Sequence, residues 1–185
     1  MATPDLLRVT GFIAAWAAAF SATSPALAEG TDLHAVATAG IARPMMNHAL
    51  YGLGPTATVG ADLALGRGDV HRAIAFVRWT GLPATGARAD IGSIEAAWRW
   101  QPSWAQGAFA QLGSGMLFEV ERLSLILPGH TLDESNTRFG APLSVALGFR
   151  AGAHVELEVG YQQLVFFRQE PRTVGIPHAS IGGRL

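Results

Sequence analysis

The residues in this sequence that could most readily do chemistry are a histidine and a serine two positions apart, His178 and Ser180. In an extended strand the side chains at positions i and i+2 lie on one face, so these groups can come within hydrogen-bonding distance. A histidine held in this way can act as the general base for a serine nucleophile, which is the chemistry of ester hydrolysis. The alternative interpretation is that both are polar groups lining the interior of the fold.

A second candidate is a pair of carboxylates with the same spacing, Glu156 and Glu158. Two carboxylates on one strand face can divide the roles of general acid and general base. A buried carboxylate without a counter-charge is costly, however. We therefore favour the interpretation that arginines on the same face neutralise both groups.

The sequence offers little for metal or cofactor binding. It contains no cysteine, which excludes disulfides, zinc–thiolate sites and thiol catalysis. The histidines do not have metal-ligand spacing. Segment 129–138 is rich in oxygen donors but lacks the DxDxDG order of a calcium loop. We predict no metal site and no cofactor.

Composition limits the class of protein further. The chain has 185 residues, of which 15% are charged, and its net charge is −1. This composition is typical of one folded domain and not of a disordered chain. A net charge so close to zero gives no reason to expect a nucleic-acid partner.

The first 28 residues are typical of a secretory signal peptide. Arg8 precedes the apolar stretch 11–22, and Ala26 and Ala28 place small residues before a cleavage site at Glu29. The alternative is a retained N-terminal anchor. We predict that residues 1–28 are removed and that the mature domain comprises residues 29–185.

The mature chain alternates apolar and polar residues with a period of two, which is typical of β-strands. From Ala141 to Phe149, for example, every second residue is apolar. Eight segments carry the pattern: 32–42, 57–66, 70–80, 91–100, 106–119, 138–150, 153–166 and 173–185.

The connections between these segments alternate between long and short. The longest are 43–56 and 120–137, with 81–90 and 167–172 of medium length, and the others are short. Up-and-down barrels of the outer membrane have this asymmetry, because their periplasmic turns are tight and their extracellular loops are longer. We predict an all-β fold, a closed eight-stranded antiparallel up-and-down transmembrane barrel.

Alternation alone does not show which face points inward. The polar faces carry few charges of mixed sign, which favours a packed lumen over a solvated surface. We predict a lumen charge network of Asp62, Arg72, Arg78, Glu95, Arg99, Glu119, Arg150, Glu156, Glu158 and Arg184. Aromatic residues gather near segment ends, as in the interfacial girdles of membrane barrels. The predicted interface aromatics are Trp79, Trp98, Trp100, Trp104, Phe139, Phe149, Tyr161 and Phe167.

In this architecture the chain resembles the small eight-stranded outer-membrane barrels, the group of OmpA-type, OmpX-type and OmpW-type domains. The resemblance covers the whole mature chain. It implies a location in the bacterial outer membrane, with membrane lipid, lipopolysaccharide and the barrel-assembly machinery as partners. Because an eight-stranded barrel is filled by its own side chains, we do not expect a pore for metabolites.

Segments 108–118, 137–150 and 153–162 also resemble the C-terminal half of the lipid A deacylase barrels. In that family the strand that matches 159–161 continues into a His-x-Ser pair, in which the serine is the nucleophile. Residues 163–167 read Gln-Leu-Val-Phe-Phe here. The pair is missing at the matching position, so the resemblance does not bring the activity with it.

Three functions remain open. The one we favour is a non-enzymatic outer-membrane protein with a structural role in the envelope or a surface interaction through loops 43–56 and 120–137. The first alternative is a lipid-A-modifying hydrolase with a degenerate site or a relocated one at His178 and Ser180. The second is a soluble periplasmic carrier similar to lipocalins, in which the apolar faces of the strands would point inward.

Overall fold

The computed structural model describes residues 33–45, 51–65, 70–127, 130–152, 154–167 and 172–184. The predicted signal peptide and its cleavage site lie outside the described residues. The described residues form one closed antiparallel barrel, so the predicted fold class is confirmed. Its eight strands are β1 (Leu33–Ala42), β2 (Gly54–Ala64), β3 (His71–Ala84), β4 (Ala87–Trp100), β5 (Ala108–Leu127), β6 (His130–Ala151), β7 (Val155–Phe166) and β8 (Arg172–Arg184).

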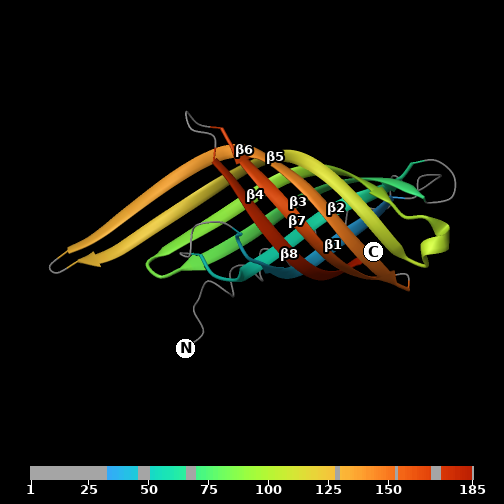
Figure 1. Ribbon diagram of the computed structural model, residues 1–185, viewed down its shortest axis with the longest axis horizontal. Coiled ribbons are helices and arrows are strands. Elements are labelled where there is room, and N and C mark those ends of the chain that lie inside the picture. The colour runs from blue at the N-terminus through green and yellow to red at the C-terminus, as the bar shows by residue number, and fades with distance from the viewer. Residues whose placement is uncertain are drawn as a thin grey trace.

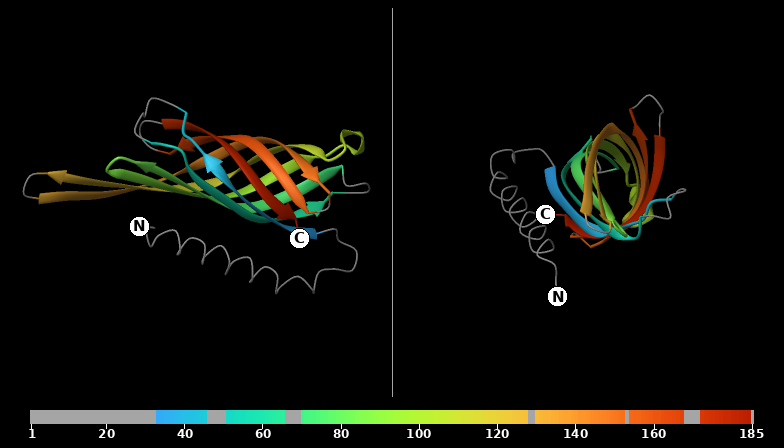
Figure 2. Two further views of the ribbon diagram at one scale, coloured as in Figure 1. Left: turned by 90° about the horizontal axis from the view of Figure 1, so that it is seen from below. Right: turned by 90° about the vertical axis from the view of Figure 1, so that its left-hand side faces the viewer.

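Each strand pairs with its neighbour in sequence, and β8 returns to β1 to close the ring. Residues 36–42 of β1 pair with residues 178–184 of β8, and the view along the barrel shows the resulting ring (Figure 2). The described part of the chain has no helix long and apolar enough to cross a membrane. The short 3-10 helix η2 (Ser103–Ala105) lies in the connection between β4 and β5.

The two ends of the barrel differ. We call the end with the β2–β3, β4–β5 and β6–β7 connections the turn rim, and the opposite end the loop rim. At the turn rim, Gly107 and Gly152 have φ angles of 102° and 68°, a left-handed conformation that glycine adopts without steric cost. At the loop rim, the β5–β6 hairpin extends well beyond the other strands (Figure 1).

This hairpin corrects the prediction of a long loop at 120–137. β5 continues to Leu127 and β6 begins at His130, so most of the predicted loop is strand. The predicted loop at 81–90 is likewise a hairpin, in which Ala84 pairs with Ala87. Beyond the barrel wall both faces of a ribbon can be polar, so a segment such as 133–137 can be β-structure without alternating apolar residues.

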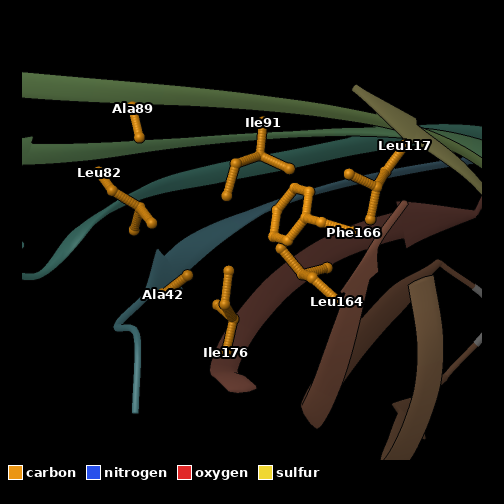
Figure 3. Packing of buried hydrophobic residues seen from close by; sticks show 8 residues of the cluster. All are labelled: Ala42, Leu82, Ala89, Ile91, Leu117, Leu164, Phe166 and Ile176. Atoms are coloured by element: carbon orange, nitrogen blue, oxygen red, sulfur yellow. The ribbon is translucent and has the colours of Figure 1, made fainter. Parts of the chain in front are cut away.

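Eight of the inward side chains near the loop rim form an apolar layer. Its buried members come from six strands and face one another across the lumen (Figure 3): Ala42, Leu82, Ala89, Ile91, Leu117, Leu164, Phe166 and Ile176. The faces predicted to be lumenal were polar, so the sequence prediction missed this layer. These side chains are tightly packed, with Leu164 at 0% exposure.

We expect Leu164→Ala to destabilise the barrel by about 2–5 kcal/mol, because it leaves a cavity in a packed layer. The control is Leu147→Ala, which removes the same atoms from a side chain that is 65% exposed on the outer wall. Urea unfolding of the protein refolded in phospholipid vesicles measures both. Equal losses in the two variants would show that the lumen layer is not packed as described.

Candidate functional site

All ten predicted lumen charges point into the barrel, and they form ion pairs at three levels along its axis. Arg99 is the centre of the lowest level, next to the turn rim. Its Nη1 donates to both carboxylate oxygens of Glu156 at 3.0 Å, and its Nε and Nη2 donate to Oε1 of Gln111 at 3.2 and 3.1 Å. The guanidinium carbon also lies 3.9 Å from the centre of the Phe109 ring. The Arg99 guanidinium is therefore fixed by a carboxylate, an amide and an aromatic ring.

Two carboxylates link the other arginines of this level to Arg99. Asp62 accepts two hydrogen bonds from Arg72, at 3.0 and 2.9 Å, and lies 3.6 Å from Nε of Arg184. Glu156 accepts from Arg150 at 3.0 and 2.8 Å in addition to Arg99. The attraction and the hydrogen bonds within these pairs offset much of the free energy that the charged groups lose when they leave water.

The middle level is built around two further carboxylates. Glu95 accepts from the Ser93 hydroxyl and from the Gln162 amide, each at 2.7 Å. Arg78 lies between Glu95 and Glu158, at 3.9 Å from an oxygen of each. Gln111 and Gln162 were not among the predicted members of the network, although they alternate in phase with Glu119 on β5 and with Glu158 on β7.

The proposed nucleophile and base both lie in this lumen. His178 is 6% exposed, and its Nε2 lies 3.3 Å from Oε1 of Glu158. The Ser180 hydroxyl oxygen is buried and has no hydrogen-bond partner, so His178 does not activate it in this arrangement. A nearby cavity bordered by Arg78 and Glu158 measures about 20 Å³. It has room for about one water and not for an acyl chain.

A third level closes the lumen mouth at the loop rim. Arg138 donates to Glu119 at 2.9 Å and to Glu121 at 2.6 Å. Tyr51, from the β1–β2 connection, donates its hydroxyl hydrogen to Glu121. Burial and the Glu121 carboxylate both raise the pKa of Tyr51, so it stays a neutral donor. Only Glu119 of these residues was predicted, because Tyr51 and Glu121 lay in segments interpreted as loops.

The outer wall has the opposite character. Its outward positions are mostly aliphatic, and many large side chains are exposed, such as Ile94 at 66%, Met116 at 73% and Val159 at 66%. Among the strand residues whose side chains the structure describes, charged groups face outward only beyond the aromatic side chains of the loop rim, where Arg88 donates to Asp90 at 2.9 and 3.2 Å. An exposed apolar surface of this size is typical of a protein that contacts lipid.

Seven of the eight predicted interface aromatics lie near one or other rim on this wall. The lower group, at the turn rim, comprises Trp98, Trp100, Trp104 and Phe149, with Trp98 stacked on His71 at 5.5 Å between ring centres. The upper group comprises Trp79, Phe139 and Phe167, together with the unpredicted Phe118, whose cross-strand partner is Phe139. Tyr161 lies midway along β7 instead, and its hydroxyl donates to Gln163 at 2.7 Å.

The separation of the two aromatic groups matches the thickness of a membrane. Phe139 and Phe149 are ten residues apart on β6. At about 3.3 Å per residue and a tilt of about 40°, they are separated by about 25 Å along the barrel axis. This is the usual height of the apolar band on outer-membrane barrels.

The described residues contain no group of three or more His, Asp or Glu side chains that could hold a metal ion. The arrangement has instead two chemical properties, an interior of mutually neutralised charges beneath an apolar layer and an exterior suited to hydrocarbon.

Comparison with known proteins supports the fold. No protein-family model matches the chain, and no curated protein matches it either. Among solved structures, Neisserial surface protein A (NspA) matches with a TM-score of 0.54 at 18% identity, covering 85% of this chain and 99% of that one. Ail, the attachment invasion locus protein of Yersinia pestis, matches with a TM-score of 0.60 at 13% identity over 85% and 99% of the chains.

A major outer membrane protein of Thermus thermophilus matches as well, with a TM-score of 0.57 at 12% identity over 83% of this chain and 99% of that one. At these identities the likeness establishes the fold alone. The chain has the fold of the small eight-stranded outer-membrane barrels, as the sequence predicted. The resemblance to the lipid A deacylases stays a prediction.

We expect Arg99→Gln to destabilise the barrel by about 3–5 kcal/mol, because it leaves Glu156 with one fewer counter-charge in a buried site. Arg43→Gln makes the same substitution at an exposed position and is the control. The double variant Arg99→Gln/Glu156→Gln should lose less than the sum of its single variants. Additive losses in urea unfolding would contradict a direct interaction between these two side chains.

Proposed function

We propose that this protein is a non-enzymatic, integral barrel of the bacterial outer membrane that displays the β5–β6 hairpin at the cell surface. The observation that carries this proposal is the distribution of side chains across the wall. Apolar residues face outward over a height of about 25 Å, and the charges face inward. A soluble carrier similar to lipocalins requires the reverse arrangement.

The filled lumen favours a role that does not involve transport. The apolar layer around Leu164 and Phe166 lies across the barrel, and the ion pairs of Arg99 and Arg138 occupy the levels on either side of it. An ion crossing the lumen would have to break these ion pairs and enter an apolar layer, which is costly.

The β5–β6 hairpin supports a surface interaction. β7 ends at Phe166, which pairs with Gly140, and the backbone of Phe167 reaches Phe139. Residues 130–138 of β6 pair with β5 on one side. On the other side, where β7 lies further along β6, they have no neighbouring strand among those described. A free edge of this kind can pair with an extended segment of another protein. Exposed Asp133 and Glu134 favour a partner strand that carries basic residues.

Fractionation of an expressing Gram-negative cell tests the location. We expect the protein in the outer-membrane fraction, with a faster mobility on SDS gels when unheated than when boiled, because a closed barrel resists SDS until it is heated. Recovery in the soluble periplasm without a mobility shift would overturn the proposal.

The chain contains no cysteine, so single cysteines can report which rim is outside. We expect Ser135→Cys, on the hairpin, to react with a membrane-impermeant maleimide in intact cells. The matched variant His154→Cys, at the exposed β6–β7 turn, should react only after the outer membrane is permeabilised. Labelling in the reverse order would show that the hairpin faces the periplasm.

Lipid A composition tests the enzymatic alternative. We expect expression of the wild-type protein to leave the acyl chains of lipid A intact, because Ser180 is buried and is not hydrogen-bonded to His178. Mass spectrometry of lipid A from expressing cells measures this. Deacylation by the wild type that disappears in Ser180→Ala would replace our proposal with the hydrolase.

A further inference from the structure

Two arginines lie side by side on the outer wall near the loop rim. Arg88 of β4 and Arg122 of β5 are cross-strand partners. The residues next to them, Ala89 and Glu121, point into the lumen, so both arginines point outward. No other arginine faces outward among the strand residues whose side chains the structure describes.

Like charges directly opposite each other on neighbouring strands are destabilising. The repulsion is only partly relieved here. The Arg88 guanidinium binds Asp90 at 2.9 and 3.2 Å, whereas the exposed guanidinium of Arg122 has no ion pair with any described residue. Asp133 on β6 is diagonal to Arg122 and does not pair with it. An anion placed between the two guanidinium groups would replace repulsion with charge-assisted hydrogen bonds.

The height of this pair indicates the kind of anion. Arg122 is four residues beyond Phe118 on the same strand and the same face. Four residues correspond to about 13 Å along the strand and about 10 Å along the barrel axis. If the aromatic side chains mark the edge of the hydrocarbon core, both guanidinium groups lie in the headgroup layer of the outer leaflet.

From this position we infer that Arg88 and Arg122 together bind a phosphate group of a phosphorylated glycolipid headgroup in the outer leaflet. The inference rests on the proposed function, because it requires the loop rim to face the cell exterior. Arginine suits this role, since its planar fork matches the oxygens of a phosphate and its long stem can lie along an apolar wall.

The test measures the affinity of the refolded full chain, in phosphatidylcholine nanodiscs, for fluorescent lipid A that carries two phosphates. Each of Arg88→Gln and Arg122→Gln should weaken binding about five-fold, and the double variant about 25-fold. Arg43→Gln, an exposed position that follows β1, makes the same charge change and should bind like the wild type. Lipid A without phosphates should bind each protein equally weakly.

Unchanged affinity in the double variant, or an equal loss in Arg43→Gln, would overturn the inference. Inorganic phosphate that displaced lipid A at equal concentration would assign the site to a free anion and overturn the lipid assignment. Each variant is also run unheated and boiled on SDS gels. A heat-dependent shift without selective lipid A binding rejects only this inference, whereas the absence of any shift in the wild type rejects the proposed function itself.

Discussion

The ladder between β1 and β8 closes the sheet, and the rest of the structure depends on that closure. Without it both strands would expose unpaired backbone groups, each of which costs several kcal/mol in hydrocarbon. Closure also divides the side chains into two sets, because alternate residues face opposite sides of the wall. The outward set can then be apolar, while the inward set has to fill a narrow lumen and neutralise its own charges.

The lumen meets this requirement in two ways along one axis. Near the turn rim, Arg99 donates hydrogen bonds to Glu156 and lies 4.0 Å from Asp62, which is paired with Arg72, so the buried charges compensate one another. Near the loop rim, eight buried apolar side chains pack against one another around Leu164. The ion pairs and the apolar layer connect the β-strands through the lumen. The described outward side chains carry no charge over the height at which they would contact lipid. The surface hairpin and the Arg88–Arg122 pair both lie beyond this boundary.

The sequence predicted the strand number, the closed topology and the position of most strands, since these depend on alternation, which is a local property. It did not predict the apolar lumen layer. The phase of Glu158 and Gln162 on β7 places Leu164 and Phe166 on the inward face. The sequence analysis expected that face to be polar, so it did not identify these two residues as lumen residues. Ion-pair partners such as Arg99 and Glu156 lie 57 residues apart, and only the barrel register brings them together. The hairpin ends were missed because polar strand residues resemble a loop.

The orientation of the wall is the central claim, and cysteine accessibility along β7 tests it most directly. Single cysteines at positions 155 to 162 of the refolded protein in vesicles would be exposed to a lipid-soluble reagent and then to a water-soluble one. The account predicts labelling by the lipid-soluble reagent at 157 and 159 and protection at 156, 158 and 162. Lipid-soluble labelling at 156 and 158, with water-soluble labelling at 157 and 159, would contradict it.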